Sequence, residues 1–392
     1  MIPLSTPFFN GNEWKYVKKC IDTAWVSTAG GYVQRFEDEI CKYTGAKFAI
    51  SCVNGTSGLF ISLKLAGVTA GDEVIVPTLT FIAPINTVKY LNAEPIFIDC
   101  DDYMNIDTQK IEEFCKEQCV LTKGGLKNKK SGKIIKAILP VHIFGNPCDM
   151  RSIVAISKKY NLKIVEDATE SLGSCYCDGN YKNMHTGTIG DFGVFSFNGN
   201  KIITTGGGGM IVTNNEKMAT LAKYLTTQAK DDSLNYIHNE IGYNFRLNNI
   251  QAALGIAQLE QLNSFIKTKK RNYAIYNTEI SSIKGLKLLG IPKNTSPNYW
   301  FYSLLVHKNE YGLDKNTLIN RLAEAKIETR PVWYLNNLQK PYLKNQSYKI
   351  EKAEYFLKTV INLPCSSNLS KKDIFNVVNK IRTIGEFSHG TN

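Results

Sequence analysis

The sequence predicts an α/β protein with a large, mostly parallel sheet and a smaller α+β domain toward its C-terminal end. Short apolar runs recur through the first 170 residues, and segments with helical periodicity separate them. The chain of 392 residues also exceeds the size at which one core usually stops growing. We therefore expect residues 1–250 to form the large domain, with the N-terminal segment free to pack on the small one. Residues 251–392 should supply a bridging helix and the small domain.

The apolar runs predict strands that are buried on both faces, because they lack the alternation of a strand with one wet face. Such runs are typical of parallel sheets. The predicted strands are FAISCV (48–53), EVIVPT (73–78), PIFIDC (95–100), KAILPVH (136–142) and KIVEDAT (163–169).

Helical periodicity marks the segments between and after these strands. Val33, Phe36, Ile40 and Tyr43 recur at helical spacing, and residues 149–160 are similarly amphipathic. A long helical pattern, residues 247–283, is expected to bridge to the second region.

Two more runs, GVFSF (193–197) and GMIVT (209–213), flank a glycine-rich connection and predict a close pair of strands. In the last hundred residues, WFYSLLV (300–306) predicts a strand and SKKDIFNVVNKIRTI (370–384) a helix. This mixture indicates the smaller α+β domain.

The composition excludes several classes of protein. It is 43% hydrophobic and 21% charged, which is ordinary for a folded soluble chain. No apolar stretch approaches the length needed to cross a bilayer, and the start MIPLSTPFFNGNEW lacks the layout of a signal peptide. We therefore expect a cytoplasmic protein with no membrane partner.

Cysteine usage and charge narrow the possible ligands. The ten cysteines contain no CxxC pair, so we expect neither a metal site nor a disulfide framework. The net charge of +12 is dispersed except in KGGLKNKKSGK (123–133), which we interpret as a solvated loop. Without a basic and aromatic recognition module, this charge favours a small phosphorylated ligand over nucleic acid.

Two polar residues stand where parallel strands end, which is where ligands collect in such sheets. Asp167 follows the run KIVED, and His142 follows ILPV. Both belong to a candidate site. From position alone, Asp167 could equally be a loop acid or helix cap, and His142 a hydrogen-bonded structural histidine.

The segment SFNGNKIITTGGGGMIV (196–212) places Lys201 between two strands and follows it with four glycines. A Walker loop is excluded because the glycines follow the lysine and no GK[ST] occurs. Four glycines cost backbone entropy, so close backbone approach or unusual dihedral angles should compensate. An exposed lysine in a loose hairpin is the competing interpretation.

A possible phosphate-binding site follows the first predicted strand of the sheet. FAISCVNGTSGLFISLKLAG predicts a strand, a turn and a helix, with Gly55 and Thr56 at the helix N-terminus. Free amides and the helix dipole there would hold a phosphate, and Thr56 could also be a simple N-cap.

These features together suit pyridoxal 5'-phosphate (PLP). This cofactor needs a lysine for a Schiff base, a carboxylate that keeps its ring nitrogen protonated, and a phosphate cup. Lys201, Asp167, and Gly55 with Thr56 supply the three.

The chain resembles the sugar aminotransferases of the DegT/DnrJ/EryC1/StrS family, in the fold-type I class of PLP enzymes. The resemblance runs over nearly the whole sequence, and its motifs occur in the family's order. The motifs are NGNEWKYV, NGTSGL, PTLTFIAPINTV, EDATESLG, SFNGNKIITTGGGGM, GYNFRLNNIQAALG and NYWFYSLL.

The resemblance implies a role for individual residues. Lys201 would carry the cofactor, Asp167 would pair with the pyridine nitrogen, and Ser196 with Gly55 and Thr56 would bind the phosphate. Phe81, in PTLTFIAP, would stack on the cofactor ring, unless it is a core aromatic.

Two further positions concern the partner subunit and a departure from the family. Asn244, in GYNFRL, matches the residue that reaches the phosphate from the neighbouring subunit, which implies a homodimer with shared active sites. Glu170 stands where many members have glutamine. A carboxylate accepts hydrogen bonds but donates one only when protonated, so the usual contact with the cofactor's phenolic oxygen is less secure.

The resemblance implies transamination, in which L-glutamate gives an amino group that a nucleotide-diphosphate keto-sugar receives. A related class removes a sugar hydroxyl but has histidine at the position of Lys201. A non-catalytic regulatory protein with this fold and a nucleotide-sugar dehydrogenase are other readings, the last weakened by the lack of GxGxxG after the first strand.

Within the family, VNGTSGLFISL, TQAKDD and IHNEIGYNFRLNNIQAALG look most like enzymes acting at C4 of UDP-4-keto-6-deoxy-N-acetylhexosamines, in routes to bacillosamine or legionaminic acid. A GDP- or dTDP-linked 4-keto-6-deoxyhexose remains open.

Overall fold

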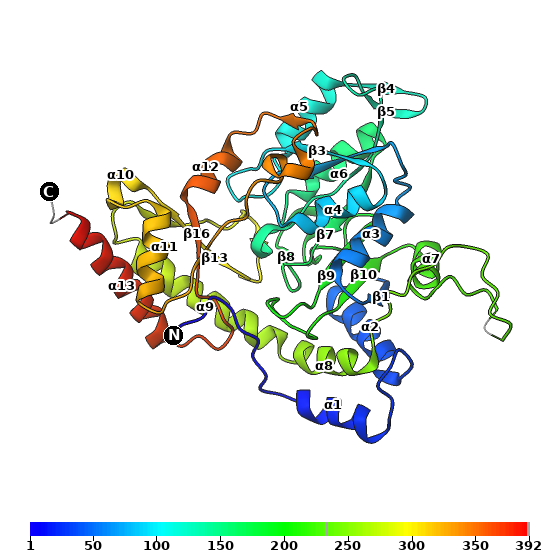
Figure 1. The fold of residues 1–392 in the computed structure, drawn as a ribbon, viewed down its shortest axis with the longest axis horizontal. Coiled ribbons are helices and arrows are strands. Elements are labelled where there is room, and N and C mark those ends of the chain that lie inside the picture. The colour runs from blue at the N-terminus through cyan, green and yellow to red at the C-terminus, as the bar shows by residue number, and fades with distance from the viewer. Residues whose placement is uncertain (233, 390–392) are drawn as a thin grey trace.

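The computed structural model describes residues 1–232 and 234–389, which form a large sheet, a smaller sheet and a two-stranded pair, with helices packed around them (Figure 1). The strands of the large sheet are β1 (Phe48–Cys52), β2 (Glu73–Pro77), β3 (Glu94–Ile98), β4 (Cys119–Thr122), β5 (Gly125–Asn128), β6 (Ile134–Ile138), β7 (Lys163–Asp167), β9 (Phe192–Ser196), β10 (Gly209–Thr213) and β15 (Ser347–Tyr348). Their order is β1-β10-β9-β7-β6-β2-β3-β15, and the β4–β5 hairpin joins at β6.

The centre of this sheet is parallel, as the apolar runs predict: β2 pairs with β3 and β6, and β7 pairs with β6 and β9, all in parallel. The first strand differs from the prediction. β1 pairs antiparallel with β10, with Cys52 opposite Gly209. An unbroken apolar run reports burial on both faces and carries no information on strand direction, so this difference could not be predicted from FAISCV.

The basic segment 123–133 is also not the solvated loop that we expected. It contains β5, which forms an antiparallel hairpin with β4. Leu126 and Asn128 are buried, and the Asn128 side-chain amide donates to Oε2 of Glu73 at 2.8 Å. Because the segment is rich in lysine, its composition does not reveal that these two side chains point inward.

Helices cover both faces of the large sheet. They are α1 (Glu13–Asp22), α2 (Gly31–Thr44), α3 (Gly55–Leu65), α4 (Ile82–Tyr90), α5 (Thr108–Gln118), α6 (Met150–Tyr160) and α7 (Glu216–Thr226). The predicted bridging helix is two helices, α8 (Asn249–Leu259) and α9 (Leu262–Ile280). Asn248 begins α8 with a capping box, in which its side chain accepts from the Gln251 amide.

The small domain contains a four-stranded sheet in the order β11-β13-β16-β14. Its strands are β11 (Leu286–Leu288), β13 (Tyr302–Val306), β14 (Arg330–Pro331) and β16 (Val360–Leu363), and its helices are α10 (Lys308–Tyr311), α11 (Lys315–Glu324), α12 (Lys352–Thr359) and α13 (Lys371–His389). Short 3-10 turns are η1 (Ile143–Gly145), η2 (Gly179–Tyr181), η3 (Asn336–Leu338) and η4 (Lys340–Tyr342).

The two domains exchange segments. β15 lies in the C-terminal half of the chain, yet it pairs with β3 of the large sheet. The pair β8 (Cys175–Tyr176) and β12 (Thr295–Ser296) joins a loop of the large domain to the chain that enters the small one. At the other end, Ile2 bridges Ile327, so the N-terminus lies against the small domain (Figure 1).

Buried apolar side chains form one cluster between the domains as well as the cores on the faces of the sheets. Phe144, Trp300, Val332 and Phe356 belong to this interdomain cluster. Among the described helices, none is long and apolar enough to cross a membrane.

Candidate active site

A cavity of about 380 Å³ opens at the carboxyl ends of β7 and β9, between the large sheet and the small domain. It gathers most of the residues that the sequence singles out. Those that line it are Gly55, Thr56, Phe81, Asp167, Glu170, Ser196 and Lys201.

Lys201 lies inside this cavity and is not the exposed residue of a loose hairpin. Its side chain is 12% exposed, and Nζ lies 3.8 Å from Oε1 of Glu170. Burial lowers the pKa of Lys201, while the carboxylates of Glu170 and Asp167 oppose that change. Burial therefore favours the neutral form of the amine, which a nucleophile or a base requires.

Glu170 forms the second half of this pair. Its Oε2 accepts the backbone N–H of Phe144 at 2.8 Å. Burial raises the pKa of Glu170 to about 7, although Lys201 and the Phe144 N–H lower it. Near neutral pH the side chain is thus divided between a carboxylate and a carboxylic acid that can donate a hydrogen bond.

Asp167 ends β7 and is 2% exposed. Its Oδ1 accepts the backbone N–H of Thr169 at 3.0 Å. Burial raises its pKa, and the hydrogen bonds from Thr169 and the nearby charge of Lys201 lower it. A cationic ligand group would therefore complement this buried carboxyl group.

The first turn of α3 forms a cradle beside these groups. The Asn54 side chain accepts the Ser57 N–H at 2.8 Å, and the helix geometry leaves the earlier amides of Gly55 and Thr56 without intrahelical acceptors. A Cβ on Gly55 would lie 3.0 Å from Cγ2 of Thr169 and 3.1 Å from Cβ of Ser196. Glycine thus keeps this end of the cavity open for an anion.

The last glycine of the run 206–209 has a packing role. A Cβ on Gly209 would lie 2.5 Å from the carbonyl carbon of Asn54. This close approach explains one glycine of the run, because it brings β10 against the turn that begins the cradle.

His142 does not line the cavity, and its side chain is fully buried. Its Nε2 lies 3.0 Å from Oε2 of Glu166, and its Nδ1 accepts the Cys148 N–H at 3.0 Å. Glu166 also accepts the amides of Gly187, Ile189 and Gly190. The sequence shows that His142 ends a strand, but the direction of its side chain depends on these distant partners.

Phe81 and Asn244 have different surroundings. Phe81 is 51% exposed at the mouth of the cavity, which argues against a core aromatic. Asn244 is exposed and does not line the cavity of its own chain.

Among the residues of the cavity wall that sequence reasoning missed are two tryptophans and a threonine. Trp300 and Trp333 come from the small domain, and Thr80 precedes Phe81. The Thr80 hydroxyl is buried and has no hydrogen-bond partner within the described part of the chain. Trp300 lies in the family-like run NYWFYSLL, which is the signal that could have identified it.

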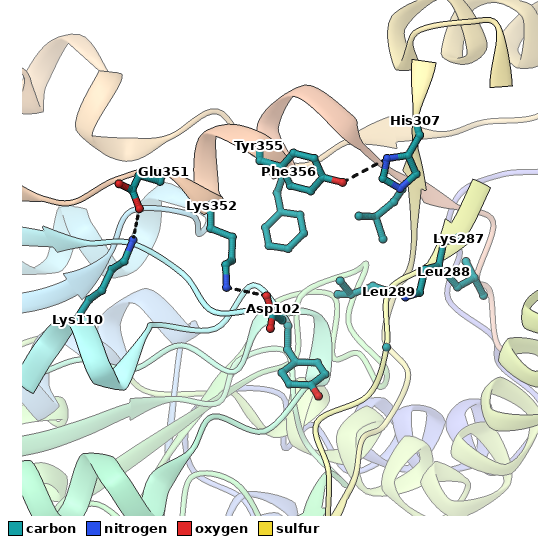
Figure 2. Close-up of a pocket in the computed structure, with 13 residues that line it drawn as sticks. Asp102, Lys110, Lys287, Leu288, Leu289, His307, Glu351, Lys352, Tyr355 and Phe356 are labelled. Atoms are coloured by element: carbon teal, nitrogen blue, oxygen red, sulfur yellow. Dashed lines mark hydrogen bonds and ion pairs between the residues drawn. The ribbon is translucent and has the colours of Figure 1, made fainter. Parts of the chain in front are cut away.

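A larger cavity of about 770 Å³ lies elsewhere between the domains, and Figure 2 shows its wall. Four of its charged groups form two pairs: Lys110 bonds Glu351 at 3.1 Å, and Lys352 bonds Asp102 at 2.6 Å. Lys110 also bonds the buried Asp99, whose carboxylate accepts three amides at the start of α12. These interactions fasten α12 to the large domain, and the smaller cavity remains the stronger candidate for chemistry.

Comparisons with known proteins agree with the interpretation of this cavity as an active site. The DegT/DnrJ/EryC1/StrS aminotransferase family matches residues 9–382. This chain belongs to that family. GDP-perosamine synthase of Escherichia coli O157:H7 is 38% identical over 97% of each chain, and that of Caulobacter vibrioides 34% over 96%. A DegT DnrJ EryC1 StrS aminotransferase from Brucella abortus has a TM-score of 0.86, at 25% identity over 95% of each chain.

The protein is thus a PLP-dependent sugar aminotransferase that acts on nucleotide-linked sugars. The cavity of this aminotransferase fits the cofactor. An amine, a buried carboxyl group, an open anion cradle and a hydroxyl with no partner among the described residues face one space. The amine would bind the cofactor's aldehyde, the carboxyl group would face its ring nitrogen, and the cradle would hold its phosphate.

Proposed function

We propose that this aminotransferase moves an amino group from L-glutamate to C4 of a nucleotide-linked 4-keto-6-deoxy sugar, with GDP as the favoured nucleotide. The names of the relatives that are 38% and 34% identical support GDP. The resemblance to enzymes of UDP-4-keto-6-deoxy-N-acetylhexosamines makes a UDP-linked N-acetyl sugar the second choice.

The observation that carries this proposal is the convergence of Lys201, Asp167 and the α3 N-terminus on one cavity. When bound, PLP supplies an electron sink for the carbon from which a proton leaves. Asp167 would hold the proton on the ring nitrogen, and Gly55, Thr56 and Ser196 would bind the phosphate. Phe81, at the cavity mouth, would cover one face of the ring.

Lys201 would attach the cofactor and then act as the base. In that second role its Nζ takes a proton from one carbon and returns it to another, so it must be neutral when it acts. Burial lowers the pKa of Lys201 and favours this form, and a cationic cofactor ring would favour it further.

Glu170 can replace the glutamine that many relatives have. With burial raising its pKa to about 7, the protonated side chain can donate a hydrogen bond to the cofactor's phenolic oxygen, as an amide would. We therefore expect the contact with this oxygen to be kept below about pH 7 and weakened above it.

A homodimer with shared active sites would complete the cavity. Asn244 is exposed, and Leu234, Tyr236 and Ile241, shortly before it, are 83%, 71% and 75% exposed. The described residues between α7 and α8, on either side of position 233, project from the body of the molecule (Figure 1). Exposed apolar side chains on a projecting segment favour burial against a second copy, where Asn244 could reach the partner's phosphate cradle.

A substrate panel tests the proposal. Protein reconstituted with PLP is mixed with glutamate and with GDP-, dTDP- or UDP-linked 4-keto-6-deoxy sugars, including the UDP-linked N-acetyl form. We expect 2-oxoglutarate and a 4-amino sugar, with the highest kcat/KM for the GDP-linked substrate. A higher value for the UDP-linked N-acetyl sugar would reverse the choice of nucleotide.

The same panel addresses the other readings. A deoxygenated sugar without an amino group would indicate dehydration, which the lysine at position 201 argues against. Failure of glutamate to bleach the colour of bound PLP would favour a protein that keeps the fold without transamination.

A further inference from the structure

Besides the carboxylate of Glu170, the amine of Lys201 has an aromatic ring as its second neighbour. Nζ lies 4.1 Å from the ring centroid of Trp300. A cation at this distance from an indole face is attracted by the negative charge density of the ring. Trp300 is 2% exposed, so little water weakens the interaction.

The indole also holds the backbone beside the lysine. Its ring N–H donates to the carbonyl oxygen of Asn200 at 2.7 Å. That carbonyl belongs to the peptide bond that joins Asn200 to Lys201. One side chain of the small domain therefore restrains both ends of the lysine, the peptide before it and the amine at its tip.

The position of Trp300 is fixed in turn by Asn298, whose side chain makes three hydrogen bonds. The backbone N–H of Trp300 donates to Oδ1 of Asn298, whose amide group donates to the carbonyls of Glu170 and Leu172 at 2.9 and 3.0 Å. The backbone N–H of Asn298 donates to Oγ of Ser174. The indole and Glu170, the two neighbours of the lysine amine, are thus joined through Asn298.

We propose that Trp300 is the positioning residue for Lys201: its ring face holds the amine and its ring N–H fixes the preceding peptide. The proposal rests on the proposed role of Lys201 as the lysine that carries the cofactor. It adds that the small domain controls where the charged amine rests in the cofactor-free protein.

The contact with Trp300 limits the positions that the charged lysine side chain can take. A long lysine side chain released in a cavity of about 380 Å³ has several rotamers, and burial disfavours its charge. The ring gives the charged amine one favourable position without a second carboxylate at that place. The charged groups that act on Lys201 are then Glu170 and Asp167, both from the large domain.

Replacing the residue at 300 with fluorinated tryptophans tests the proposal. Fluorine draws electron density from the ring and weakens its hold on a cation, while size and the ring N–H are kept. The readout, in cofactor-free protein, is the pH midpoint at which Lys201 reacts in trace competitive labelling with an amine reagent, quantified by peptide mass spectrometry.

We expect the midpoint to fall stepwise with the number of fluorine atoms, by roughly half to one pH unit in total. The same fluorinated residues at position 333 are the matched control, because Trp333 lines the cavity too. A midpoint that does not depend on fluorine at position 300, or that changes equally at position 333, would overturn the proposal.

A second pair of variants tests the same contact without unusual residues. Trp300→Phe keeps an aromatic face and Trp300→Met does not, while both lose the bond to Asn200. The Met variant should titrate at the lower pH, and equal midpoints would count against the proposal. Borohydride reduction after addition of PLP is read separately: a pyridoxyl group on another lysine would refute the role of Lys201 and leave the Trp300 contact to be judged by the titrations.

Discussion

Nζ of Lys201 lies 3.8 Å from Oε1 of Glu170, and burial moves the pKa of each group toward its uncharged form. The pair can therefore exist as an ion pair or as a neutral amine beside a carboxylic acid. Since burial raises the pKa of Glu170 to about 7, a modest change of pH near neutrality changes the fraction of Glu170 that is charged beside the amine.

Glu170→Gln should raise the stability of the cofactor-free protein at high pH. The pKa of Glu170 is raised in the folded state, so the wild type loses stability as pH rises from the unfolded value through about 7. Glutamine does not ionise and can still accept the Phe144 N–H. The gain should be near zero at pH 4 and reach at most about 3 kcal/mol at pH 8.5.

Urea unfolding at the two pH values measures this difference. Glu354→Gln, on the exposed side of α12, is the control and should change little at either pH. A gain for Glu170→Gln that is the same at both pH values would contradict the assigned pKa.

Lys201→Ala should lose at least roughly a hundredfold in turnover, the lower range for loss of a proton-transfer group. It should also lose the visible absorbance of the lysine-bound cofactor. Activity of each half-reaction and the absorbance spectrum are measured without added amines. Wild-type turnover in this variant would show that another group carries the chemistry.

Asp167→Asn keeps the shape of the side chain but removes the charge that would hold a proton on the cofactor ring nitrogen. We expect the variant to retain part of its PLP through dialysis while its rate with glutamate falls sharply, and Asp167→Ala to behave similarly. Cofactor content and single-turnover rates separate binding from chemistry. A nearly unchanged rate would assign Asp167 to the local fold alone.

His142→Asn should weaken the fold and leave substrate affinity alone. The substitution disturbs the contacts of the ring with Glu166 and the Cys148 amide, all of which are buried. We expect the free energy of unfolding to fall by about 1–3 kcal/mol. KM values for both substrates should stay the same, and a raised KM at unchanged stability would place His142 in contact with ligand after all.

Mixing two inactive variants tests the shared site. Asn244→Asp sets a carboxylate where an amide would face a phosphate, so it should be damaging. In heterodimers with Lys201→Ala, one shared site has both lesions and the other has neither, so activity should return. Mass labelling must show that chains exchange, and continued inactivity despite exchange would mean that each site is built from one chain.

The sequence predicts most of the large domain because its strands are buried on both faces and therefore continuously apolar. It also predicts the membership of Lys201, Asp167 and Glu170 in one cavity, because the family motifs carry them. It did not place Trp300 and Trp333 there. These residues reach the cavity only when the small domain packs against the large one, and such pairings between distant residues leave no local periodicity.

The two remaining differences also have physical causes. The direction of β1 depends on β10, which lies more than 150 residues later. In segment 123–133 the lysines outnumber the inward-facing Leu126 and Asn128, so composition conceals the hairpin.

The contacts of the N-terminus bear on how the chain folds as it is synthesised. Ile2 bridges Ile327, and the Leu4 carbonyl accepts the Cys365 N–H. Residues 2–4 therefore meet these partners only when the chain has been made as far as residue 365, while the strands β1 to β10 can already assemble. Deleting these first residues should slow the final docking step of refolding and leave the earlier formation of the large sheet unchanged.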